Sequence, residues 1–150
     1  MSPCILYSIS GIPSVSLGSR ALRYYVHTQQ WLSELEFSKA ELVFLQNLLA
    51  DYSSRAADKP SRLRKLIKLD HELVKLSNTL ISAISKLRDA VVSLEKAAAF
   101  APGETEEKSA ETFLTLEAGT DQTKRTLRRL KSELYNLIGT IIYETRSFAG

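Results

Sequence analysis

The sequence predicts an all-α protein, an elongated antiparallel three-helix bundle whose helices meet along coiled-coil-like heptad seams. Apolar residues recur at alternating three- and four-residue spacings through three long segments. The chain also has only 6 Gly and 4 Pro, most of them before residue 20 or in two short breaks, which leaves too few turn residues for an all-β fold. At 150 residues it has the length of one domain. We therefore predict a leader at 1–18, irregular or disordered, and a single helical-bundle domain at 19–150, with helices at about 19–53, 61–100 and 105–147.

The leader, residues 1–18, differs in composition from the rest of the chain. It is rich in Ser, Gly and Pro, and no acidic residue precedes Glu34. An irregular segment is the favoured interpretation, and a misassigned translation start near residue 25 stays open within it. A targeting segment is the alternative, but a transit peptide would carry arginine, which the first 19 residues lack. Gly11 and Pro13 interrupt any apolar core of a secretory signal.

The first helix is expected to begin at Ser19, a good N-cap residue. Its apolar positions follow a helical seam, with Ser38 at the one polar position. The seam residues are Trp31, Leu35, Leu42, Leu45, Leu49 and Tyr52. Tyr24, Tyr25 and Trp31 gather near the start of this helix; we interpret them as the cap of the core, with a binding interface as the alternative.

The second helix carries the strongest periodic pattern in the chain. No Gly or Pro interrupts the segment 61–100. Asp58 is a candidate N-cap, and Pro60 is tolerated in a first turn. The predicted seam consists of Leu66, Leu69, Leu73, Leu76, Leu80, Ile84, Leu87, Val91, Leu94 and Ala98. A helix of this length, about 60 Å at 1.5 Å per residue, needs equally long partners.

Pro102 and Gly103 separate the second helix from the third. The third seam is phased on Phe113, Leu116, Thr120, Thr123, Leu127, Leu130, Leu134, Leu137, Ile141 and Phe148. Because this register continues through Gly119, we expect an unbroken helix with a polar layer at Thr120 and Thr123. A break near Gly119 is the alternative.

No motif indicates catalysis, a metal or a cofactor. Helical di-iron proteins use Glu-x-x-His, but neither His27 nor His71 has a Glu three residues before it. The neighbours Asp70 and Glu72 point away from His71 on a helix. Nucleophile elbows and glycine-rich phosphate loops are missing from the sequence. We therefore predict a protein that is not an enzyme and needs no cofactor.

A basic cluster on the third helix is the candidate phosphate-binding site, for nucleic acid or an anionic membrane surface. It consists of Arg125, Arg128, Arg129 and Lys131, with Lys124 beside them. The alternative is a solvated face paired with acids on neighbouring helices. In an antiparallel hairpin the cluster would face residues 74–81, which lack acids, so we expect incomplete neutralisation.

The leading functional hypothesis is a structural or protein–protein interaction protein that self-associates. We expect three helices of unequal length to leave part of the long seam uncovered, and an uncovered apolar stripe binds a partner. The candidate interaction seam comprises Leu42, Leu45, Leu49, Leu73, Leu80, Leu87, Leu130, Leu134 and Ile141. No segment has the roughly 18 apolar residues of a membrane span, and we expect a cytoplasmic protein. The single Cys4 fits a reducing compartment but also many periplasmic proteins, so it does not decide the compartment.

Overall fold

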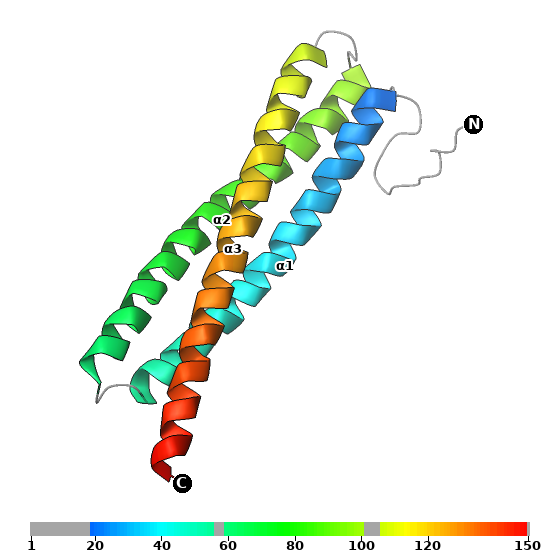
Figure 1. Cartoon of the computed structure of the whole chain (residues 1–150). Helices are drawn as coiled ribbons and strands as arrows, with labels where there is room; N and C mark the ends of the chain where they lie inside the picture. Colours follow the sequence, from blue (N-terminus) through cyan, green and yellow to red (C-terminus); the bar gives the residue numbers. More distant parts are fainter. Residues whose placement is uncertain (1–18, 56–58, 101–105, 150) are drawn as a thin grey trace.

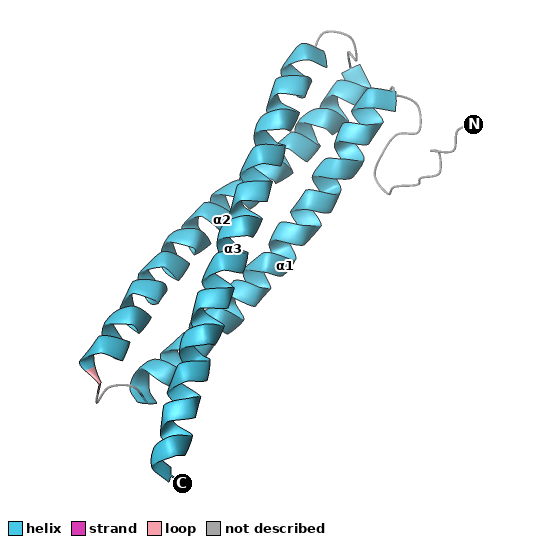
Figure 2. Cartoon of the chain, viewed as in Figure 1, coloured by secondary structure: helices cyan, strands magenta, loops and turns pink. Residues whose placement is uncertain are grey.

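The fold is a three-helix bundle, as the sequence predicts. The computed structural model describes residues 19–55, 59–100 and 106–149, which form helices α1 (Ser19–Arg55), α2 (Pro60–Phe100) and α3 (Glu106–Ala149) (Figures 1 and 2). These ranges contain no strand. The leader and Asp58 lie outside the described residues, as do the side chains of Ala98 and Phe148.

The helices run alternately up and down the bundle. α2 is antiparallel to α1 and α3 is antiparallel to α2, so that α1 and α3 run in the same direction (Figure 1). Every helix contacts both others. α3 has 44 residues, which corresponds to about 66 Å at 1.5 Å per residue. The bundle is therefore an elongated rod.

The core is a column of leucine and isoleucine side chains at the predicted heptad positions. The buried apolar residues are Tyr25, Leu35, Leu42, Leu45, Leu49, Leu66, Leu69, Leu73, Leu76, Leu80, Ile84, Leu87, Val91, Leu127, Leu130, Leu134, Ile138 and Ile141. Ile138 is buried although the predicted seam passes through Leu137, which packs against the core only partly buried. Near its end α3 thus turns a wider apolar face to the core than a strict heptad describes.

α3 continues through Gly119 without interruption, so the alternative of a break there is wrong. The predicted polar layer is present, because Thr120 and Thr123 are both buried. The Thr123 hydroxyl donates a hydrogen bond of 2.8 Å to the Gly119 carbonyl oxygen. The Thr123 hydroxyl is therefore satisfied within its own helix.

The aromatic residues near the start of α1 belong to the core, as interpreted from the sequence. The Tyr24 ring stacks on Phe113 of α3 at a centroid distance of 4.3 Å, and the Trp31 ring lies 4.9 Å from the same ring. Tyr25 is buried and donates a hydrogen bond of 3.2 Å to Glu95 of α2. Burial, which disfavours the phenolate, raises the pKa of Tyr25, and Glu95 raises it further. This cluster joins all three helices at one end.

At the other end, the turn into α2 is tied to α3. α2 begins at Pro60, one residue before the predicted start near 61, and the Lys59 carbonyl accepts a hydrogen bond of 3.0 Å from the Leu63 amide. Glu144 of α3 forms ion pairs with Lys59, at 3.2 Å, and with Arg62. The C-terminal part of α3 is thereby held to the start of α2.

Candidate interaction surface

The nine residues of the predicted interaction seam all lie inside the bundle. Leu42, Leu45, Leu49, Leu73, Leu80, Leu87, Leu130, Leu134 and Ile141 are each at most 3% exposed. The expectation that part of the long seam stays uncovered is therefore wrong. The three helices have 37, 41 and 44 residues, and lengths this similar let each helix cover the seams of the other two. The seam residues build the core, so any binding surface must lie elsewhere.

Part of the basic cluster on α3 faces α1. Lys124 contacts Glu34 at 2.7 Å, and one heptad further along, Lys131 contacts Glu41 at 2.8 Å. The hydrogen bond from Lys124 holds the pKa of Glu34 below its usual range. These two pairs form a row along the α1–α3 groove.

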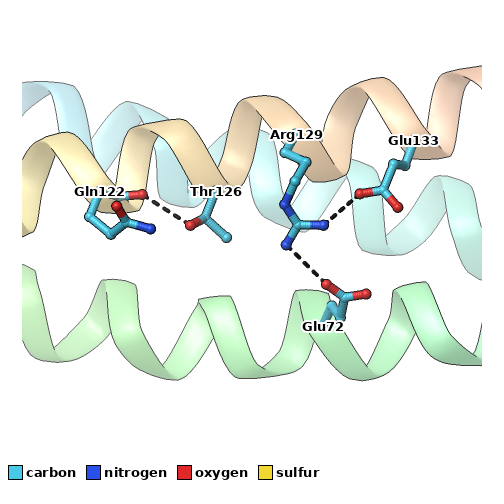
Figure 3. Close-up of polar contacts among 5 residues, drawn as sticks. All are labelled: Glu72, Gln122, Thr126, Arg129 and Glu133. Carbon is cyan, nitrogen blue, oxygen red and sulfur yellow. Dashed lines mark hydrogen bonds and ion pairs between the residues drawn. The ribbon is translucent and has the colours of Figure 1, made fainter.

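The rest of the cluster is paired as well, with one exception. Arg129 bridges two carboxylates, Glu72 of α2 at 3.1 Å and Glu133 of α3 at 2.6 Å (Figure 3). The hydrogen bond to Glu72 raises the pKa of the Arg129 guanidinium above its usual range. Arg125 pairs with Asp121 at 2.9 Å. Within the described part of the chain, Arg128 alone in the cluster has no ion-pair partner.

The expectation of an incompletely neutralised cluster is thus corrected. Glu34 and Glu41 approach the cluster from α1, which runs parallel to α3, and α2 contributes Glu72, just outside the acid-free segment 74–81. Most of the cluster therefore holds the three helices together and offers little free charge to a phosphate group.

A second apolar surface runs along the outer side of α1. Ser33, Phe37, Ala40, Phe44 and Asn47 repeat at spacings of four, three, four and three residues, and all five are exposed. We call this set the α1 outer stripe. Phe37 is 72% exposed and Phe44 is 55% exposed. No charged residue belongs to the stripe.

The apolar surface continues from the stripe toward α2. Glu36 and Arg88 form an ion pair of 2.6 Å across the outer edge of the α1–α2 interface. One heptad later in α1 and one heptad earlier in α2, the equivalent positions are Val43 and Ile81, each 51% exposed. Because the two helices are antiparallel, the ion pair brings these two residues level with each other. This edge is therefore polar at one end and apolar farther along.

A shallow, open depression of about 560 Å³ lies between α1 and α3. Trp31 and Leu114 supply its apolar lining, and the charged side chains around it include Asp121 and Lys124. Both of these charges are already paired, with Arg125 and Glu34. We assign this depression no ligand.

Neither metal-site geometry nor a membrane-spanning segment is found in residues 19–55, 59–100 and 106–149. These residues contain no group of three or more His, Cys, Asp or Glu placed to hold a metal ion. None of the described helices has a stretch apolar enough to cross a lipid bilayer. Comparison of the chain with protein-family models, with curated proteins and with solved structures gave no match. The surface features of the bundle are therefore the basis for any functional proposal.

Proposed function

We propose that this chain is a structural or protein–protein interaction protein without catalytic activity, and that it self-associates. The observation that carries the proposal is the α1 outer stripe. α1 is apolar on the side that faces the core, and on its outer side the stripe exposes two phenylalanines and no charged residue, while charged residues such as Glu34 and Glu36 lie at the edges between these two sides. An exposed apolar row of this kind is typical of a surface that binds a partner. The nine residues from Leu42 to Ala50 include no charged side chain.

The size of the exposed surface supports an interaction role. With about 200 Å² for each phenylalanine, the exposures of Phe37 and Phe44 correspond to about 250 Å² of apolar surface. Covering that area is worth about 6 kcal/mol per chain at 25 cal/mol per Å², before the cost of association. Together with the half-exposed Val43 and Ile81, the patch reaches the range of about 300–600 Å² that is often functional on a monomer.

A phosphate-binding function has less support. Of the five cationic residues in the α3 cluster, four form ion pairs with carboxylates. Counterion release from nucleic acid requires cations that are free to contact phosphates. Interaction between protein chains is therefore the function that the described surface favours. The single cysteine of the sequence fits a reducing compartment such as the cytoplasm.

The test is the mass of the protein in solution. Size-exclusion chromatography with light scattering, at low and high salt, should give a species of at least twice the 16.8 kDa chain mass. Because the proposed contact is apolar, the assembly should persist at high salt, where surface ion pairs are screened. A chain that stays monomeric at about 100 μM in both salts would refute self-association, because its dimer Kd would then lie well above the micromolar range.

A further inference from the structure

We propose that the α1 outer stripe binds the α1 outer stripe of a second copy, with the two α1 helices antiparallel. This inference rests on the self-association proposed above, and it adds the surface and the orientation. In the resulting dimer the two α1 helices would lie side by side at the centre, each with its own α2 and α3 behind it. α1 would then be surrounded by helices, which fits its apolar outer side.

The shape of the stripe favours an antiparallel partner. Large and small side chains alternate along it, with Phe37 and Phe44 separated by Ala40. In an antiparallel pair, Phe37 lies against the partner's Ala40 and Phe44 against the partner's Ser33. Each large side chain thus meets a small one, as close packing requires. A parallel pair would instead place Phe37 against the partner's Phe37, so that overfilled and hollow layers would alternate.

The charges beside the stripe are compatible with this contact. Glu34 and Glu41 flank it on the α3 side, and Glu36 flanks it on the α2 side. In the antiparallel register, Glu34 comes beside the partner's Glu41. Two bare carboxylates would repel each other there, but Lys124 and Lys131 already neutralise them. The four side chains then form a network of alternating charge at the rim, and no unpaired charge is buried.

The available area fits a second copy of this chain. A stable dimer buries about 800 Å² on each partner, and about 65% of a homodimer interface is apolar. The two phenylalanines supply about 250 Å² of exposed apolar surface, estimated from about 200 Å² per ring. Val43, Ile81 and Val74 lie along the adjoining α1–α2 edge and are about half exposed, so they extend the apolar area beside the stripe. The two phenylalanines supply about half of the roughly 520 Å² of apolar area that such an interface needs on each partner, and the three aliphatic side chains of the edge add to it.

The first experiment locates the contact. Phe37→Asp/Phe44→Asp is compared with Leu114→Asp, a residue that is 62% exposed on α3 and does not belong to the stripe. Light scattering gives the mass, and circular dichroism verifies that the helices remain. We expect a dimeric wild type, a monomeric double variant at concentrations where the wild type is dimeric, and a dimeric Leu114→Asp control.

The possible failures are distinguishable. A dimeric double variant would overturn this interface and leave self-association standing. Loss of the dimer in Leu114→Asp as well would show that the effect is not specific to the stripe, and would also overturn the assignment. A monomeric wild type would refute the proposed function, and this inference with it.

The second experiment determines the orientation. A spin label is attached at Ser54→Cys, an exposed position near the end of α1, after Cys4→Ser removes the single native cysteine. If Phe37 faces the partner's Ala40, Ser54 lies about 23 Å from the dimer axis along the helix, so the two labels are about 46 Å apart. A parallel dimer would place them on the order of 10–20 Å apart, close to the spacing of neighbouring helices. Double electron–electron resonance at the longer distance supports the antiparallel arrangement, and the shorter distance overturns it.

Discussion

Replacing Gly119 by alanine should stabilise the protein. Gly119 lies in the interior of α3 and is exposed, and a Cβ added there meets no atom within 4 Å. Alanine in a helix interior is more favourable than glycine by about 0.8–1.0 kcal/mol, chiefly because glycine loses more backbone freedom on folding. Nothing at this position offsets that gain, because the Gly119 carbonyl keeps its bond from Thr123 whichever residue is present. We therefore expect about 1 kcal/mol of added stability.

Gly139 provides an internal comparison. It too lies within α3 with open space around an added Cβ. Gly139→Ala should give a similar gain, and the double variant about 2 kcal/mol, since the sites are too far apart to interact. Each kcal/mol raises the Tm of a domain of this size by about 2–4 °C.

The assay is urea unfolding followed by circular dichroism at 222 nm, at one protein concentration, with Tm from thermal melts. An unchanged m value with a higher midpoint would show a gain in stability alone. If Gly119→Ala lowered the free energy of unfolding while Gly139→Ala raised it, an unbroken α3 would be refuted, because alanine is unfavourable only where the backbone leaves the helical region.

Three further outcomes are expected. Leu134→Ala should cost about 2–5 kcal/mol because its side chain is fully buried, whereas Leu114→Ala, at 62% exposure, should change the free energy of unfolding by less than about 0.5 kcal/mol; equal effects in urea melts would contradict the assigned core. Lys124 lowers the pKa of Glu34, so the stability from this pair is complete above the ordinary value of 4.5 and is lost as the pH falls through the lower folded value. In Glu34→Gln the free energy of unfolding should therefore fall less steeply as the pH is lowered, by less than about 1 kcal/mol because the pair is partly exposed. The same pH dependence in variant and wild type would count against the pair. Labelled DNA and anionic liposomes should show no saturable binding even at low salt, because Arg128 alone in the basic cluster lacks an ion-pair partner among residues 19–55, 59–100 and 106–149; tight binding abolished by Arg128→Gln would contradict this.

The helices and the core were predictable because both follow from local spacing. The heptad steps of α2 fix which side of that helix is apolar, and its predicted seam from Leu66 to Val91 is buried throughout. The boundaries followed from local chemistry in the same way, with Pro60 at the first position of α2. Ile138 shows the limit of a strict heptad, since the apolar face of α3 is wider there and Ile138 is buried beside the predicted positions Leu134 and Ile141.

The surface was less predictable because it depends on how the helices are rotated against one another. Lys124 and Glu34 are 90 residues apart, and nothing in the spacing of either segment indicates that they meet. Phe37 and Phe44 are visible in the sequence, but the predicted seam of α1 describes only the side of the helix that faces the core and does not include them. Only the packed bundle shows that a second heptad row, through Ala40, faces outward.

The position of α3 as the last of the three helices determines the order in which the bundle can be completed during translation. α1 and α2 can pair as soon as Phe100 has been made, but the groove that α3 fills still exposes core leucines such as Leu45 and Leu80. At 5–20 residues per second, the 44 residues of α3 take about 2–9 s to synthesise. For that interval the growing chain exposes both the leucine groove between α1 and α2 and the α1 outer stripe. Neighbouring chains on the same messenger RNA would be the nearest surfaces able to cover the groove or the stripe.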